Sequence, residues 1–277
     1  MQAEIVILGS GTSMGVPTLG CNCAVCTSTD PRNTRTRPSI AVEWGDHRVI
    51  IDTGPDFRQQ ALREKIQHID AVFYTHPHAD HILGLDDLRP LSFRHAGGMD
   101  LYADDRTISI LETVFSYTFS PTAKYPTRAR VNLKCFNGHD SVQIADAAFQ
   151  RVPLLHGQLP VAGFRFGSAA YLTDMSSIPD TSLPLLEDLD VLILDALRKE
   201  PHPSHANVEQ ALGWVERVRP QRAFFTHMSH ELDQTITEAE LPPHVRLSYD
   251  GLRIPFELPV QPPEPQAEQI RNEAGER

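Results

Sequence analysis

The sequence predicts a mixed α/β (α+β) fold in which two strand-rich layers pack together with helices on the outside. Short apolar runs recur through both halves of the 277 residues and end at polar or glycine positions, as buried strands do. Other segments place apolar residues every three or four positions, which is typical of helices that pack one face on a sheet. The chain is long enough to bury a sizeable core in one large domain or two small ones.

The first half is expected to hold several strands and one clear helix. A glycine-rich segment at 9–17 follows the first strand and lacks the lysine of a phosphate-binding P-loop, so we expect a tight turn that lines a site. Asp56 can cap a helix over 57–68, with Leu62 on its apolar side. The expected strands are 4–8, 39–44, 47–52 and 69–74.

The second half repeats this strand-rich character. Helical spacing covers 105–117, and Ser204 can cap another helix that runs to about Val218. Between them, basic residues in an exposed loop at 121–130 either contact a phosphate group or are simply solvated. The expected strands are 149–155, 163–166, 169–173, 191–194, 223–226, 245–249 and 252–256.

Four potential metal ligands directly follow the apolar run 69–74: His76, His78, Asp80 and His81. Neutral imidazoles and a carboxylate suit zinc, manganese or iron. In an extended segment His76 and His78 point the same way, whereas Asp80 and His81 follow a turn and can address a second ion nearby. The alternative is a chance cluster of surface histidines, but the fixed order and the preceding strand favour a metal site.

Three further donors are expected directly after predicted strands. His156 ends one apolar run, Asp174 ends the next, and His227 ends a third. Each alone is more often a structural or surface residue, but their shared position at strand ends strengthens all three as ligands. Asp174 suits a bridge between two cations, because a carboxylate has two oxygens.

Three cysteines lie close together, at Cys21, Cys23 and Cys26. In a chain with no visible secretion signal, this spacing indicates a metal rather than a disulfide. Three thiolates need one more donor for a tetrahedral zinc, and His230 can turn toward them. The cysteine loop would then lie beside the active site and brace its wall. The alternatives are a redox pair or three unligated buried thiols. Cys135 stands apart and is expected in the core.

Composition and charge narrow the function further. The net charge of −11 disfavours nucleic acid and anionic membranes as partners, although a metal cluster can attract a small anionic substrate. No apolar run approaches the roughly 20 residues of a membrane span, and the first residues lack the features of a signal peptide, so we expect a cytoplasmic protein. Because 259–277 is rich in Pro, Glu and Gln, we expect a folded domain over 1–258 and then a disordered tail.

These residues together resemble the metallo-β-lactamase superfamily, through His-x-His-x-Asp-His at 76–81 followed in order by His156, Asp174 and His227. The resemblance spans the chain from Ile5 to about Phe256 and implies an αββα sandwich, two β-sheets flanked by helices. A closer likeness is to the PhnP-type cyclic-phosphate phosphodiesterases. It rests on the segments 9–13, 21–26, 84–89 and 226–230.

The closer resemblance implies two divalent catalytic ions, manganese or zinc, and one structural zinc. It implies that one catalytic ion is held by His76, His78 and His156, the other by Asp80, His81 and His227, with Asp174 bridging them. It implies that the structural zinc is held by Cys21, Cys23, Cys26 and His230.

The resemblance also assigns residues that act on the substrate or support a ligand. Asp80 and His205 are the expected catalytic residues, and His205 matches a family histidine at the start of a late helix. His202 lies close by and competes for this role. Asp52 matches a supporting aspartate that would orient a ligand histidine.

The function implied is hydrolysis of a small cyclic phosphodiester, such as 5-phosphoribosyl 1,2-cyclic phosphate in phosphonate catabolism or a 2′,3′-cyclic nucleotide. The family also favours a homodimer. The main alternative is an endonuclease that processes tRNA 3′ ends, which shares much of the metal motif, although neither a long Gly/Pro-rich arm nor a basic charge is present. A β-lactamase, glyoxalase or lactonase would leave the cysteine loop unexplained. A protein that binds a metal or nucleotide without turnover is the non-enzymatic alternative.

Overall fold

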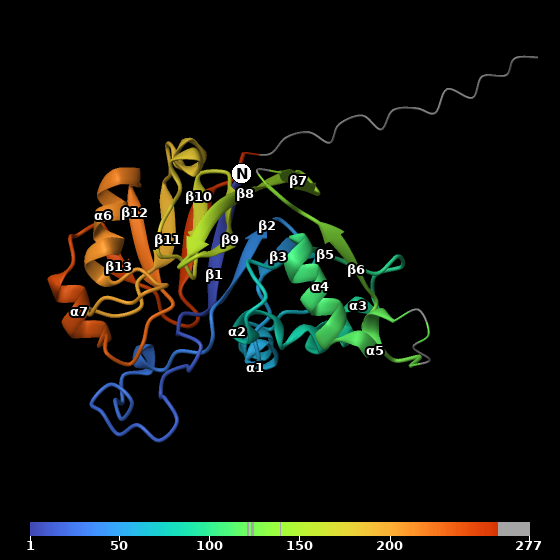
Figure 1. Cartoon of the computed structure of the whole chain (residues 1–277), viewed down its shortest axis with the longest axis horizontal. Coiled ribbons are helices and arrows are strands. Elements are labelled where there is room, and N and C mark those ends of the chain that lie inside the picture. Colours follow the sequence, from blue (N-terminus) through green and yellow to red (C-terminus); the bar gives the residue numbers. More distant parts are fainter. Residues whose placement is uncertain (121, 123–124, 139, 260–277) are drawn as a thin grey trace, which may run out of the picture.

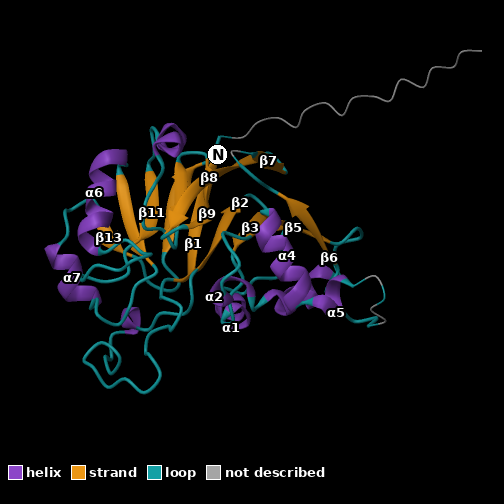
Figure 2. Cartoon of the chain, viewed as in Figure 1, coloured by secondary structure: helices purple, strands orange, loops and turns teal. Residues whose placement is uncertain are grey.

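Two mixed β-sheets packed face to face form the centre of the computed structural model, with helices on both outer faces (Figure 1, Figure 2). The structure describes residues 1–120, 122, 125–138 and 140–259. The first sheet has the order β14 (Arg253–Glu257), β1 (Gln2–Gly9), β2 (Ser39–Trp44), β3 (His47–Ile51), β4 (Ala71–Phe73), β5 (Met99–Ala103) and β6 (Val131–Cys135). The second has the order β13 (Val245–Leu247), β12 (Arg222–Thr226), β11 (Val191–Asp195), β10 (Ala169–Leu172), β9 (Leu159–Phe166), β8 (Ala147–His156) and β7 (Ser141–Ile144).

The helices are short and occupy the outer faces and the loops near one end of the sheets. The α-helices are α1 (Phe57–Arg63), α2 (Ala79–Ile82), α3 (Arg89–Ser92), α4 (Asp105–Val114), α5 (Ser116–Phe119), α6 (Val208–Val218) and α7 (Gln234–Glu240). The 3₁₀ helices are η1 (Pro31–Asn33), η2 (Leu85–Leu88) and η3 (Asp180–Leu186). Among the described residues, no helix combines the length and apolar character needed to cross a membrane.

The inner strands of both sheets, such as β2, β10 and β11, are buried on both faces, which explains the continuous apolar runs in the sequence. Between the sheets, the ring of Phe73 stacks on that of Phe149 at 5.1 Å and meets Phe164 edge-on at 5.3 Å. On the outer faces, Leu111 of α4 packs on the first sheet and Val215 of α6 packs on the second. The expected αββα sandwich is confirmed.

Several predicted boundaries were wrong, for local reasons. The helix expected over 57–68 ends at Arg63, because Lys65 adopts a left-handed conformation (φ 54°) and the Ile66 amide bonds back to the Ala61 carbonyl, as in a Schellman motif. Leu62 is 62% exposed rather than on an apolar face. Asp56 does not cap this helix.

The carboxylate of Asp56 accepts hydrogen bonds from Arg37 instead. The second expected cap, Ser204, was also misplaced. Helix α6 begins four residues after Ser204, because the Asn207 side chain accepts from the Gln210 amide in a capping box. The carbonyl of Ser204 is used by His156.

The edge of the sandwich was the least predictable part. Strands β5, β6 and β7 were not expected. Apolar and polar residues alternate in β6 and β7, but both are short edge strands with exposed positions. Cys135 in β6 is exposed, not in the core, and its thiol donates to Asp105.

The neighbouring basic loop makes local contacts. Arg128 donates to the Ser120 carbonyl, and the Arg130 guanidinium lies over the Phe93 ring. Lys124 lies outside the described residues, as does nearly all of the tail predicted to be disordered.

Candidate active site

The predicted ligands come together where strands of both sheets end. Strands β3 and β4 run parallel in the first sheet, and β10, β11 and β12 run parallel in the second. Their carboxyl ends therefore meet at one edge of the sandwich, where the loops after them can converge. This explains why donors far apart in the sequence form one site.

Two groups of donors share Asp174. The ligand atoms of each group lie within 4.8 Å of one another. One group consists of His76, His78, His156 and Asp174, and the other of Asp80, His81, His227 and Asp174. These are the two sets that the family resemblance implied.

The carboxylate of Asp174 is divided between the groups. Its Oδ1 atom lies 3.2 Å from Nε2 of His81 and 3.2 Å from Nε2 of His227. Its Oδ2 atom lies 3.7 Å from Nε2 of His76. One oxygen thus faces each group, an arrangement that would let the carboxylate bridge two ions.

The atoms that face the centre of the site are buried and unpaired. Within the described residues, Nε2 of His76, His81 and His227 and Oδ2 of Asp80 have no hydrogen-bond partner. Buried polar atoms without partners are costly, and a cation would satisfy all four. Two ligands of one tetrahedral zinc lie about 3.4 Å apart. The His81 and His227 Nε2 atoms lie 3.3 and 3.6 Å from Asp80 Oδ2, so these residues fit a metal ion.

The opposite ring nitrogens are held by protein groups. His81 Nδ1 donates to Asp52 at 2.7 Å, as the resemblance implied, and His156 Nδ1 donates to the Ser204 carbonyl at 2.6 Å. Thr75 donates its hydroxyl to Asp52 and lies 3.0 Å from His76 Nδ1, from which it can accept. Each contact keeps the proton on Nδ1 and leaves Nε2 free to bind a metal.

Three residues of the site adopt left-handed backbone conformations within two residues of the ends of their strands. The φ angles of Asp52, Asp174 and His227 are 64°, 51° and 59°. Such conformations cost non-glycine residues on the order of 1–2 kcal/mol each. Strain of this kind clusters at functional sites, where the surrounding structure imposes the geometry.

The two groups differ in their electrostatics. Burial lowers the pKa of His76, of His78 and of His156, so these imidazoles are neutral donors. Burial also opposes the charged form of His227, but the Asp174 and other carboxylates outweigh it and raise the pKa to about 9. The same balance raises the pKa of His81. The carboxylates thus concentrate negative charge in the second group, which favours a cation there.

His205, and not His202, contacts the ligand histidines. Its ring stacks on that of His227 at 4.7 Å and lies 4.4 Å from that of His156. Its Nδ1 donates to Asp195 at 2.7 Å, which leaves Nε2 available. His202 lies one ring further out, 5.0 Å from His205.

Asp195 is a site residue that the sequence analysis missed, as it missed the supporting roles of Thr75 and Ser204. It is fully buried at the end of β11, and its Oδ2 atom also accepts from the Met175 amide at 3.0 Å. Burial raises the pKa of this carboxyl. The available signal was a carboxylate directly after the apolar run 191–194, the same signal that identified Asp174.

The three cysteines meet His230 beside this site. Their Sγ atoms lie 3.2, 3.4 and 3.5 Å from Nδ1 of His230, in the order Cys21, Cys23 and Cys26. Sulfur and nitrogen ligands of one tetrahedral zinc are separated by about 3.6 Å. The hydrogen bond from the Cys26 amide is the largest influence that lowers the pKa of Cys23 to about 6, which favours the thiolate. The cluster therefore fits a structural zinc.

A small cavity of about 210 Å³ adjoins His205. The glycine-rich segment forms part of its wall, which agrees with the expected turn lining a site. The lining residues are Thr12, Ser13, Met14, Leu197, Arg198, His202, His205, Ser229, His230 and Glu231.

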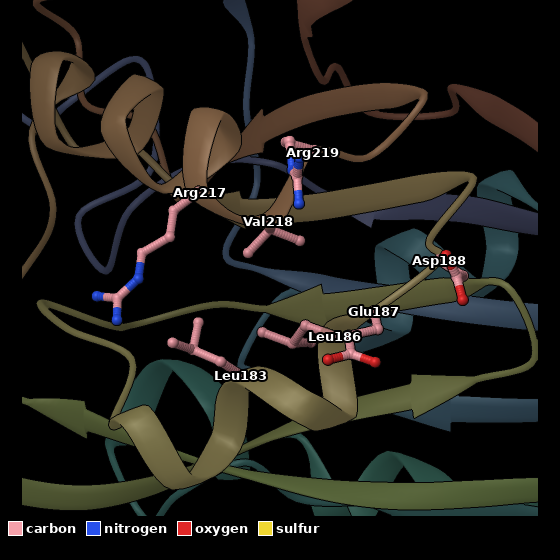
Figure 3. A pocket seen from close by; sticks show the side chains of 7 residues that line it. All are labelled: Leu183, Leu186, Glu187, Asp188, Arg217, Val218 and Arg219. Carbon is pink, nitrogen blue, oxygen red and sulfur yellow. The ribbon is translucent and has the colours of Figure 1, made fainter.

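A larger cavity of about 590 Å³ lies at the other end of the strands, between η3 and the end of α6 (Figure 3). Its residues Asp188 and Arg219 precede β11 and β12, whereas the metal-site residues follow these strands. It therefore lies away from the chemistry, separated by about 13 Å of strand.

Comparison with known proteins places this site in a family. The beta-lactamase superfamily domain matches residues 47–228. A solved diphosphatase of the PhnP family is 49% identical, covers 93% of this chain and 98% of its own, and superimposes with a TM-score of 0.87. Zinc-bound PqqB from Methylobacterium extorquens shares the fold, with 19% identity, a TM-score of 0.73, and coverage of 91% of this chain and 99% of its own.

A curated relative has a name of another kind. The octanoyltransferase of Porphyromonas gingivalis is 37% identical over 251 residues, which are 89% of this chain but 50% of that protein. The chain thus spans about half the length of this relative. From the domain match and the 49% identity over nearly the full length, the chain belongs to the metallo-β-lactamase superfamily and, within it, to the PhnP family.

Proposed function

We propose that this protein is a metal-dependent hydrolase that opens a small cyclic phosphodiester, such as 5-phosphoribosyl 1,2-cyclic phosphate. The observation that supports this most directly is the shared carboxylate of Asp174, with one oxygen toward each donor group and His205 beside them. Two divalent ions, manganese or zinc, can both be held by His and Asp donors. When bound, such a pair supplies a nucleophile from water at neutral pH and offsets the charge of the phosphoryl oxygens.

The residues of the chain hold the donors and move one proton. Asp52, Thr75 and Ser204 fix the ligand imidazoles, so that little reorganisation is needed when substrate binds. The proton on Nδ1 of His205 stays in the hydrogen bond that it donates to Asp195. His205 exchanges its other proton at Nε2. When the P–O bond breaks, that proton passes to the leaving alkoxide, a contribution of typically about 10²–10⁴-fold. Asp80, the other expected catalytic residue, acts as a donor of the second group.

A second candidate is cleavage of a diphosphate, supported by the 49% identical diphosphatase. Both reactions attack phosphorus, but they differ in the leaving group. A phosphate leaves as a weaker base than an alkoxide and needs less help from an acid. His205→Ala should therefore slow opening of a cyclic ester much more than cleavage of a diphosphate, with metal content unchanged.

Processing of tRNA, octanoyl transfer and binding without turnover have less support. A tRNA precursor is a large polyanion, and the net charge of −11 does not attract it. The octanoyltransferase name belongs to a protein of which half lies outside the match. The cavity beside His205 has largely polar walls, whereas an octanoyl chain is apolar. Binding without turnover would not need an available proton donor beside the metal ligands. A homodimer and a cytoplasmic location stay predictions.

The deciding experiment is phosphorus NMR of metal-loaded protein with three substrates: ribose 1,2-cyclic phosphate, 2′,3′-cyclic AMP and ADP. Opening of the first supports the proposal, and opening of the second alone moves the function toward nucleotides. Cleavage of ADP alone favours the second candidate, cleavage of a diphosphate, over opening of a cyclic phosphodiester. Asp174→Ala protein prepared in parallel controls for contaminating enzymes. If all three substrates persist, the phosphohydrolase proposal fails, and tRNA precursors are the next substrates to test.

A further inference from the structure

The cavity beside His205 is built by three separate segments. The glycine-rich turn supplies Thr12, Ser13 and Met14, and the loop after β12 supplies Ser229, His230 and Glu231. The segment after β11 supplies Leu197, Arg198, His202 and His205. At about 210 Å³ the cavity holds the equivalent of about seven water molecules. It is below the roughly 300–1,000 Å³ of pockets for drug-sized ligands, so a sugar-sized group suits it.

His205 connects this cavity to the reacting centre. The same imidazole lines the cavity and stacks on the ring of His227. In the proposed reaction, His205 protonates the leaving oxygen. A group bound in the cavity thus contacts the proton donor for the leaving oxygen, and the cavity is the natural place for the sugar that carries this oxygen.

Arg198 supplies a pre-ordered cation to the cavity wall. Its Nε and Nη2 atoms donate to the carbonyls of Glu200 and Pro201, at 3.2 and 3.0 Å, which fixes the plane of the guanidinium. Its remaining nitrogen, Nη1, lies 3.6 Å from Oε1 of Glu231. This distance is an ion pair but is too long for a hydrogen bond. Ion pairs at partly exposed sites are weak, so an incoming anion can displace Glu231.

The rest of the lining is suited to a polyol. Thr12, Ser13 and Ser229 carry hydroxyl groups, which donate to and accept from sugar hydroxyls equally well. Glu231 is the carboxylate among the residues that line this cavity. Because the other lining groups suit sugar hydroxyls, the ion pair of Arg198 and Glu231 decides whether the cavity accepts a second anionic group on the substrate.

We propose that the cavity binds the sugar of the substrate and that Arg198 selects sugars that carry a second anionic group, such as a phosphate monoester. This inference rests on the proposed phosphohydrolase function and assigns the residue that recognises the second anionic group of its substrate. Nη1 carries two N–H groups, and guanidinium N–H groups form short, charge-assisted hydrogen bonds to phosphate oxygens. Glu231 competes with that phosphate for Nη1 and sets how strongly unphosphorylated sugars are disfavoured.

The test compares ribose 1,2-cyclic phosphate with and without a 5-phosphate, using wild type, Arg198→Gln and Glu231→Gln. Arg198→Gln should raise KM for the phosphorylated substrate by about 10–100-fold, the value of one or two charge-assisted hydrogen bonds, with kcat unchanged within about twofold. KM for the unphosphorylated substrate should change little. Glu231→Gln should lower KM for the phosphorylated substrate. Arg217→Gln is the matched control, since Arg217 lines the distant cavity and pairs with Asp180.

Two outcomes would overturn the inference. Equal losses on both substrates would mean that Arg198 only holds the loop with Glu200 and Pro201 in place. No loss on either would mean that it does not contact the substrate.

Calorimetry with ribose 5-phosphate and metal-loaded protein provides a readout without turnover. Weaker binding to Arg198→Gln than to wild type is expected, and equal binding contradicts the inference. If wild type opens neither cyclic phosphate but binds ribose 5-phosphate through Arg198, the proposed reaction fails while the anion subsite stands.

Discussion

Asp195→Asn changes one charge beside His205 and leaves the shape of the side chain intact. Both hydrogen bonds that Asp195 accepts, from His205 and from the Met175 amide, end on its Oδ2 atom. The carboxamide oxygen of asparagine can take this position and accept both. The amide nitrogen then replaces Oδ1, an atom that is buried without a partner among the described residues. The substitution thus removes the charge of the acceptor more than the contact itself.

The expected magnitude follows from this geometry. A hydrogen bond to a charged group contributes about 1.5–3 kcal/mol, and a neutral one about 0.5–1.5 kcal/mol. A loss of about 1–2 kcal/mol from the stabilised imidazolium corresponds to about 5–30-fold in rate. The effect should be smaller than that of His205→Ala, which removes the general acid and its roughly 10²–10⁴-fold contribution.

The assay uses two substrates that differ in their need for an acid. Ribose 1,2-cyclic phosphate releases a poor alkoxide leaving group, whereas bis(4-nitrophenyl) phosphate releases a nitrophenolate that departs without a proton. Asp195→Asn and His205→Ala should lower kcat/KM for the first substrate much more than for the second. Metal content must be measured in each variant, because Nδ1 of His227 lies 4.0 Å from Asp195. Equal losses on both substrates with metals retained would refute the assignment of His205 as the acid.

Other predictions test the metals and the stability of the fold. Asp174→Ala removes the shared donor, so metal analysis should show no more than about one catalytic ion per chain, and full occupancy would contradict the bridge. Cys23→Ser should lower the melting temperature by about 5 °C or more while the catalytic metals stay bound, since structural zinc contributes directly to folding; an unchanged value counts against the zinc. Burial raises the pKa of Asp70, but the Arg48 amide and His68 outweigh it, and the net shift is downward. The Asp70 carboxylate therefore stabilises the fold fully above about pH 3.9, its pKa in the unfolded chain. This stabilisation is lost as the pH falls through the lowered pKa of Asp70 in the folded protein. Asp70→Asn should lower the urea midpoint by an amount equivalent to about 1 kcal/mol at pH 6, and a gap that persists unchanged at pH 3 would argue against this.

The ligand residues were predictable because their signal is local. An apolar run followed directly by His or Asp marks the end of a buried strand, and this pattern identified His156, Asp174 and His227. The same pattern at Asp195 was overlooked because that residue is not a member of the metal motif. Its role depends on His205, which is ten residues away and follows no apolar run.

Helix starts and edge strands were less predictable, because competing partners decide them. Ser204 is a good cap residue, yet its hydroxyl lies 3.4 Å from Nδ1 of His202, and the Asn207 side chain caps the helix instead. Strand β7 has too few apolar positions to stand out, and it forms because β8 offers it an open edge. Both outcomes depend on neighbours that the local sequence does not contain.

The sequence by itself predicted the type of fold, the residues of the two donor groups and the cysteine cluster, because residue chemistry and strand periodicity are properties of short segments. The tertiary structure decided that Asp174 places one oxygen in each donor group and that Asp195 holds His205. It also decided that Arg198 and Glu231 lie 3.6 Å apart in the wall of a small cavity. These relations join loops from distant parts of the chain, and their distances are set by how the two sheets pack and where their strands end.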